Sequence, residues 1–109
     1  MATSRYRVRY ATIYVFSAGA KGVRVSSSPE RLTVRAGDIV DWTVVNAGAA
    51  PAGRVSIQWK ERSPLKGEPK PFERFERAAV LRKVKPGLYR YSILIDGKVV
   101  FDPELEIMS

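Results

Sequence analysis

The stretch LTVRAGDIVDWTVVN, residues 32–46, indicates the fold class of this chain. On both sides of its Gly37-Asp38 pair apolar residues alternate with polar ones, and the apolar positions are Leu32, Val34, Val40, Trp42 and Val44. A period of two places side chains on one face of a β-strand, and a Gly-Asp pair favours a tight turn. The stretch therefore predicts two consecutive strands, each with one apolar face.

The same period of two recurs through the rest of the chain. Strands are expected within residues 5–16, 22–28, 32–36, 40–44, 55–60, 89–95, 99–101 and 105–107. Asp96-Gly97, between two of these segments, is a strong signal for a two-residue hairpin turn. Seven to nine short strands separated by turn residues are typical of a β-sandwich.

The segment that follows the proline-rich loop fits two secondary structures. Phe72, Phe75 and Ala79 have the spacing of a helix face, but alternate residues in the same segment also fit a strand. We expect irregular chain or a short helix near residues 72–76, followed by a strand over about 77–84.

With 109 residues the chain has room for one hydrophobic core, and we expect residues 1–109 to form a single domain. Hydrophobic residues make up 45% of the chain and charged residues 28%, a balance typical of globular rather than disordered proteins. The sequence has no signal-peptide pattern and no apolar run long enough to span a membrane. A cytoplasmic location is therefore expected, unless a leader has been removed.

The chain contains no Cys and no His. Disulfides, zinc–thiolate and iron–sulfur sites, thiol nucleophiles and Ser-His-Asp triads are therefore excluded. The acidic residues lack the dense spacing of a calcium loop, and there is no glycine-rich phosphate loop. We therefore expect no cofactor, no metal site and no enzymatic activity.

Two stretches resemble the cupredoxin family. The strand, Gly-Asp turn, strand and Asn of residues 32–46 resemble one part of it, and PGLYRY, residues 86–91, resembles the Pro-Gly-x-Tyr-x-Tyr entry into its metal-bearing strand. The strand expected within residues 102–107 also fits the family's order. The resemblance implies an all-β fold, a single Greek-key β-sandwich of about seven to nine strands.

The residues that hold copper in that family are absent. The family places a His in the loop after the Asn strand, yet residues 47–53 contain none. Ile93 stands where the family has its Cys, residues 96–98 offer neither the second His nor a Met, and Met108 follows too late. Type 1 copper needs two His and one Cys, so the resemblance implies the fold without its copper site.

Nineteen Lys and Arg against eleven Asp and Glu give a net charge of +8, which favours attraction to nucleic acid, anionic lipid or acidic protein. Arg5, Arg7 and Arg9 would lie about 7 Å apart on one strand face, a spacing that suits the phosphates of an extended single strand. Charged residues at a sheet edge also block pairing with other chains, and we favour that role. If the surface binds a polyanion instead, the predicted residues are Arg5, Arg7, Arg9, Arg82, Lys83, Lys85 and Arg90.

The aromatic residues follow the apolar faces of the expected strands. Trp42 and Trp59 could form a platform for sugars, but both are in register with core positions, so we expect them in the core. The tyrosines could stack on nucleic-acid bases, but most alternate with polar residues on half-buried strands. We therefore expect them in the core or at its rim: Tyr6, Tyr10, Tyr14, Tyr89 and Tyr91.

Together, these patterns favour a non-catalytic cupredoxin-like binding or structural domain without copper. An immunoglobulin-like or carbohydrate-binding β-sandwich is one alternative, and a basic module that binds nucleic acid or another polyanion is a second. The expected partner is a protein or an anionic surface, because no nucleic-acid-binding motif supports the second alternative.

Overall fold

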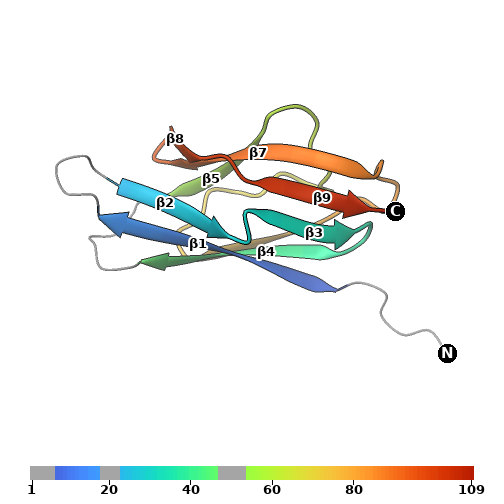
Figure 1. Ribbon diagram of the computed structural model, residues 1–109, viewed down its shortest axis with the longest axis horizontal. Helices are drawn as coiled ribbons and strands as arrows, with labels where there is room; N and C mark the ends of the chain where they lie inside the picture. The colour runs from blue at the N-terminus through green and yellow to red at the C-terminus, as the bar shows by residue number, and fades with distance from the viewer. Residues whose placement is uncertain (1–6, 18–22, 47–53) are drawn as a thin grey trace.

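The computed structural model describes residues 7–17, 23–46 and 54–109, and its strands form two sheets packed face to face (Figure 1). The described residues contain no helix, so none of them belongs to a helix that could cross a membrane. Their nine strands are β1 (Val8–Ser17), β2 (Val23–Ser28), β3 (Arg31–Arg35), β4 (Ile39–Asn46), β5 (Val55–Trp59), β6 (Phe75–Ala79), β7 (Gly87–Ile95), β8 (Lys98–Phe101) and β9 (Glu104–Met108). The all-β sandwich predicted from the alternating pattern is confirmed.

The strands divide into two mixed sheets. Sheet I contains β2, β1, β4 and β6 in that order, and sheet II contains β3, β9, β7 and β5, with β8 also paired to β7. β1 runs parallel to β4 and β3 parallel to β9, whereas the other pairs are antiparallel. As a result β1, β4 and β7 begin at the end of the sandwich where β3, β6 and β9 finish.

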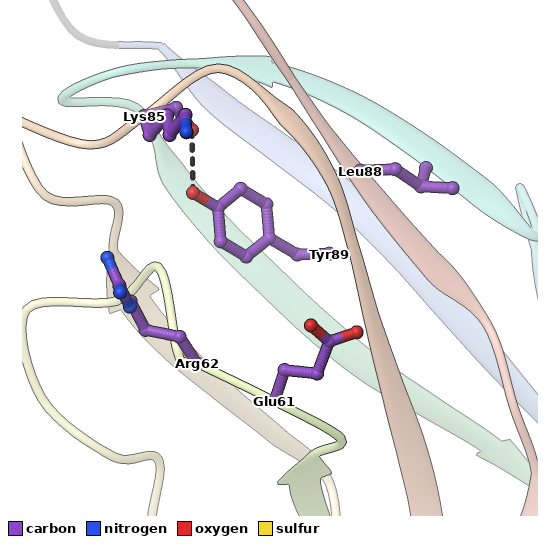
Figure 2. Close-up of a pocket in the computed structure, with 5 residues that line it drawn as sticks. All are labelled: Glu61, Arg62, Lys85, Leu88 and Tyr89. Carbon is purple, nitrogen blue, oxygen red and sulfur yellow. Dashed lines mark hydrogen bonds between the residues drawn. The ribbon is translucent and has the colours of Figure 1, made fainter.

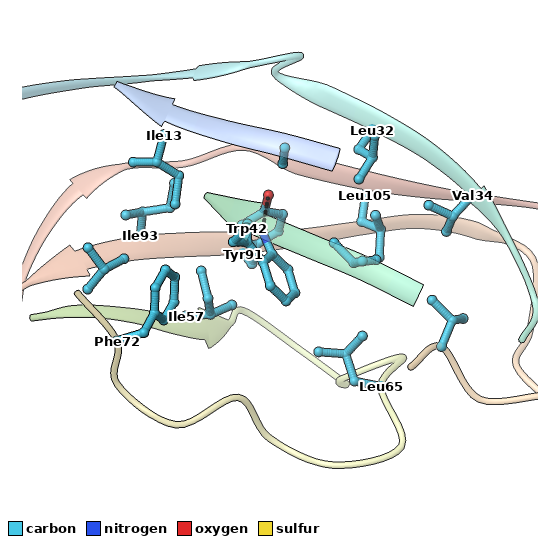
Figure 3. Packing of buried hydrophobic residues seen from close by; sticks show 14 of the residues in the cluster. Ile13, Leu32, Val34, Trp42, Ile57, Leu65, Phe72, Tyr91, Ile93 and Leu105 are labelled. Atoms are coloured by element: carbon cyan, nitrogen blue, oxygen red, sulfur yellow. Dashed lines mark hydrogen bonds between the residues drawn. The ribbon is translucent and has the colours of Figure 1, made fainter. Parts of the chain in front are cut away.

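The core lies between the sheets and is built from the inward-facing residues of both (Figure 3). Trp42 and Tyr91 are fully buried there, and Trp42 Nε1 donates a hydrogen bond of 3.2 Å to Tyr91 Oη. The Trp59 ring packs 4.9 Å from the Tyr91 ring, so the predicted place of both tryptophans in the core is confirmed. Burial raises the pKa of Tyr91 to about 12, against the opposing effect of the hydrogen bond from Trp42.

Two predicted turns depend on residues with positive φ. Gly37 has a φ of 85° between β3 and β4, and Asp96 and Gly97 have φ of 49° and 84° between β7 and β8. Gly, and to a lesser degree Asp, tolerates this left-handed region. The pairing of Ile95 with Lys98 confirms the predicted Asp96-Gly97 hairpin.

The short helix expected near residues 72–76 is not formed, and the strand begins earlier than predicted. β6 covers Phe75–Ala79 because these residues pair with β4 along their whole length. A helix here would deprive the backbone groups on that side of β4 of these partners. After β6, Val80 forms an isolated bridge with Leu65, and the chain turns before β7.

The first strand points its odd-numbered residues into the core. Alternate residues from Ala11 to Val15 are fully buried, and the pairing of β1 with β4 continues through them without a shift in register. Tyr10 therefore lies on the outer face of sheet I with 57% of its surface exposed, and its predicted place at the core is wrong. Tyr6 lies outside the described residues. Tyr14 is half-buried on the same outer face as Tyr10, so its predicted place at the core is wrong as well. Tyr91 in the core and Tyr89 packed against it are as predicted.

Candidate functional site

A core residue fills the position that the resemblance assigns to the copper thiolate. Ile93 has no exposed surface and packs between the sheets with Ile13 and Phe72 (Figure 3). Its aliphatic side chain has no lone pair to offer a metal. Met108 lies at the opposite end of the sandwich, where β7 begins. No group of three or more acidic side chains is placed to hold a metal within the described ranges, and the loop 47–53 lies outside them.

Cationic side chains gather at the end of the sandwich where β3 and β6 finish and β1, β4 and β7 begin. They come from four segments: the start of β1, the end of β3, the loop after β5 and the β6–β7 connection. We call this surface the basic end, and its exposed residues are Arg7, Arg35, Arg62, Lys66, Arg82, Lys83 and Lys85.

The β3–β4 turn fixes one side of the basic end. Asp38 is buried, and its carboxylate accepts hydrogen bonds from the backbone N–H of Arg35 at 2.9 Å and of Arg7 at 3.2 Å. The backbone N–H of Ile39 in turn donates to the carbonyl of Arg7 at 2.8 Å. The Asp38 carboxylate is therefore hydrogen-bonded to the backbone of these two arginines and does not pair with their side chains, which are exposed.

The β6–β7 connection fixes the other side of the same turn. The N–H of Gly37 donates to the carbonyl of Val80 at 3.2 Å, and the N–H of Val80 donates back to the carbonyl of Asp38 at 2.8 Å. A Cβ on Gly37 would lie 3.9 Å from Cγ of Arg82. Arg82 and Lys66 line a hollow of about 390 Å³ beside this turn, so the turn brings cations from distant segments together.

A second hollow of about 330 Å³ lies where the loop after β5 meets the start of β7 (Figure 2). It is lined by Glu61, Arg62, Lys85, Leu88 and Tyr89. The Tyr89 hydroxyl donates a hydrogen bond of 2.6 Å to the carbonyl of Lys85, which holds the β6–β7 connection against β7. The hollow therefore combines two cations and one carboxylate with an aromatic and an aliphatic wall.

The structure brings four of the predicted polyanion-binding residues together at the basic end: Arg7, Arg82, Lys83 and Lys85. Arg90 lies elsewhere, on the outer face of sheet II, where its guanidinium is 3.3 Å from Glu61, and Arg5 lies outside the described residues. Sequence reasoning missed Arg35, Arg62 and Lys66. The only signal for the last two is the excess of positive charge in the sequence from residue 54 to residue 90, because their loop has no period.

Arg7 immediately precedes β1, and Arg9 lies near the start of that strand, where it is paired on one side. β2 pairs with β1 from Thr12 onward, so the preceding residues of β1 are paired with β4 alone within the described chain. Arg9 is half-buried opposite Val40, and Arg7 is exposed. Arg9 thus lies on the inward-facing side of β1, so the predicted row of solvent-facing arginines is not formed there. Protection of this edge by charge stays a prediction.

Acidic residues compensate the cations on the outer face of sheet II. Arg31 Nε lies 3.0 Å from Glu104, and Lys60 Nζ lies 3.3 Å from Asp102. The hydrogen bond that Ser92 donates to Asp102 at 2.6 Å lowers the pKa of that carboxyl, and Lys60 adds to the effect. Three cations of sheet II therefore have acidic partners within 3.3 Å, whereas Arg7, Arg35, Lys66, Arg82, Lys83 and Lys85 of the basic end take part in no ion pair among the described residues.

Comparison with known proteins supports the fold. No family profile matches the chain, and no curated protein matches it in sequence. Among solved structures, a copper-containing nitrite reductase (NirK) from Thermus scotoductus SA-01 is 16% identical with a TM-score of 0.54; the match covers 90% of this chain and 22% of that one. A pseudoazurin from Sinorhizobium meliloti is 16% identical over 94% of this chain and 75% of its own, with a TM-score of 0.48. The likeness to the reductase, of which this chain spans about a fifth, confirms the predicted cupredoxin-like fold.

Proposed function

We propose that this chain is a copper-free, non-catalytic cupredoxin-like domain that binds an anionic partner at its basic end. The observation that carries the proposal is the contrast between the two ends of β7. At its far end, Ile93 occupies the thiolate position as part of the core. At its near end, exposed cations from four segments surround a turn whose carboxylate is already hydrogen-bonded.

The chemistry of the chain supports a non-catalytic role. Without His and Cys, the common general base and the thiol nucleophile are missing. The buried carboxylates are committed to the fold: Asp38 accepts from backbone N–H groups, and Asp41 accepts from Thr43 and Arg77. Glu61, the carboxylate that lines the second hollow, lies 3.3 Å from the guanidinium of Arg90.

The arrangement of the cations supports binding. Lys66 and Arg82 line one hollow, and Arg62 and Lys85 line the other. Two hollows at the same end of the sandwich, each lined by two cations, attract a ligand with repeated negative charges more strongly than single surface lysines do, because their potentials add. An extended polyanion that crosses the basic end would contact both.

Salt-dependent binding of heparin tests the anion site. In a triple variant with Lys66→Gln, Arg82→Gln and Lys85→Gln, we expect weaker binding and a log–log salt slope flatter by about two, since each lost contact releases fewer counterions. The matched control removes the same charge from sheet II, away from both hollows, with Arg31→Gln, Lys60→Gln and Lys98→Gln, and it should bind nearly as the original protein does. Equal losses in the two variants would show that only net charge matters and would refute the site.

Calorimetric titration with Cu(II) tests the copper-free part separately. We expect no stoichiometric binding, because neither imidazole nor thiolate is available. A tight one-to-one copper complex would contradict this part of the proposal, whatever the heparin experiment shows.

A further inference from the structure

The outer face of sheet I carries exposed aromatic rings where a solvent-facing sheet normally carries polar side chains. Phe75 is 60% exposed, Tyr10 57% and Phe16 38%, and they belong to three positions on β6 and β1. The register places Tyr10 opposite Asp41, and Thr12 opposite Thr43. An exposed apolar patch of this kind marks a surface that another molecule covers.

A charged group lies in the middle of this aromatic face. Arg77 is paired with Asp41, which is 4% exposed, and Arg77 Nε donates a 2.6 Å hydrogen bond to it. That bond raises the pKa of the guanidinium, which stays charged, and the Arg77 side chain is 51% exposed. Because Asp41 takes the Nε–H, the guanidinium still has the donors of its terminal nitrogens to offer a ligand.

The aromatic face runs into the basic end. Ile39 and Ala79 are paired on the outer face, and both also line the hollow that contains Lys66 and Arg82. A further hollow of about 550 Å³ joins Arg77 to Lys66, and Lys70, Glu68 and Glu76 also line it. The rings, the guanidinium and the two further cations therefore lie along one surface, which also carries two carboxylates. We call it the aromatic–basic face, and it comprises Tyr10, Phe75, Arg77, Lys66 and Arg82.

We propose that the aromatic–basic face binds single-stranded nucleic acid, with bases stacked on Tyr10 and Phe75 and phosphates held by Arg77, Lys66 and Arg82. Single-strand binding combines these two elements: aromatic platforms for bases and a cationic track for the backbone. The proposal rests on the proposed function, because it identifies the anionic partner of the basic end and extends the site across sheet I.

The geometry of the sheet suits successive bases. β4 lies between the strands that carry Tyr10 and Phe75, and the two residues are offset by two positions along the strands. At ordinary strand spacings this places them about 12 Å apart. An extended single strand crosses such a distance in about two nucleotides. A duplex would present its phosphates but hide its base faces. A second copy of this +8 chain would bring like charges together.

Fluorescence anisotropy with a labelled oligothymidine and an abasic oligonucleotide of equal length tests the proposal, because the two probes differ only in the bases. At low salt we expect oligothymidine to bind at least fivefold more tightly than the abasic strand. Tyr10→Ser with Phe75→Ser should remove this difference while leaving affinity for the abasic strand unchanged. Val99→Ser, at a residue that is 57% exposed in β8, is the matched control and should change neither.

Other results of these binding experiments would overturn one or both proposals. Equal binding of both oligonucleotides, weakened in the Lys66, Arg82 and Lys85 variant, would overturn base stacking but leave the proposed anion site intact. Failure of both oligonucleotides and of heparin to bind would overturn the two proposals together. If sedimentation shows a dimer that Tyr10→Ser and Phe75→Ser dissociate, the face pairs two copies and the nucleic-acid proposal is wrong. Unchanged thermal unfolding of each variant shows that its fold is retained.

Discussion

The two outer faces of this sandwich expose different kinds of side chains to solvent. On sheet II, surface cations have acidic partners, as Arg31 has in Glu104. On sheet I, exposed rings such as Tyr10 and Phe75 surround an ion pair whose carboxylate, Asp41, is buried. Both sheets follow the same inward alternation, so the difference arises from the outward residues alone. The core pattern specifies the fold, and the outward residues decide which face is left for a ligand.

The largest expected effect on stability comes from Tyr91, in the core that both sheets share. Burial holds the pKa of Tyr91 at about 12, above the ordinary value of 10.0. The folded state therefore keeps this proton longer than the unfolded state, so the contribution is complete below pH 10 and is lost as the pH rises towards 12. Two pKa units correspond to about 3 kcal/mol of unfolding free energy. Urea denaturation at pH 9 and pH 11.5 should show the loss, and Tyr91→Phe should show much less; an equal loss would assign it to other groups.

The next largest effect is expected from the ion pairs, whose loss should lower the free energy of unfolding more on sheet I than on sheet II. Asp41→Asn removes a buried charge that accepts hydrogen bonds from Thr43 and Arg77, and we expect a loss of about 2 kcal/mol. Glu104→Gln breaks a pair at the surface of sheet II and should cost less than about 0.5 kcal/mol. Urea denaturation at pH 7 measures both values. Equal costs would mean that the two faces are electrostatically alike.

The carboxylate of Asp102 provides a smaller, acid-side test of sheet II. The hydrogen bond from Ser92 lowers its pKa below the ordinary 3.8, so the stabilisation is present above that value and is lost as the pH falls through the lowered pKa. Ser92→Ala should move the pKa upward, towards 3.8, and Lys60→Gln should move it in the same direction by less. Carboxyl NMR titration reads both shifts. A pKa that does not move in Ser92→Ala would show that the hydrogen bond is absent in solution.

The aromatic residues of sheet I should affect stability least. Phe75→Ser removes a ring that is 60% exposed, so the free energy of unfolding should change by less than about 0.5 kcal/mol, while solubility in ammonium sulfate rises. Val99→Ser should alter neither measurement appreciably. If Phe75→Ser destabilises the protein strongly, the ring belongs to the fold and sheet I has no vacant face.

The alternation of apolar and polar residues allowed us to predict the strands that have one buried face. Trp42 and the Asp96-Gly97 hairpin were predicted correctly, because a period of two and a left-handed turn are local properties. Tyr10 was placed wrongly, because either face of its strand could have been the inner one until β4 paired with it. The helix expected near residues 72–76 failed for the same reason, since pairing with β4 overrides local spacing.

The candidate site was predicted in part for a related reason. Arg82 and Lys85 stand in a visibly basic stretch, so charge alone suggested them. Lys66 reaches the same surface only because the bridge between Leu65 and Val80 holds two loops together, and neither loop carries a periodic signal. Contacts between irregular segments depend on the closed sandwich, which composition and spacing do not describe.

The position of β9 governs the order in which this protein can fold. β9 is the strand that joins β3 to β7, so sheet II exists as two separate pieces until residues 104–108 have been made. At a synthesis rate of about 10 residues per second, β3 waits about 7 s for its neighbour, far longer than a hairpin needs to form. Folding dominated by such distant pairings takes milliseconds to seconds. During translation, the interval in which β3 lacks its neighbour is therefore set by the rate of synthesis and not by the rate of strand pairing.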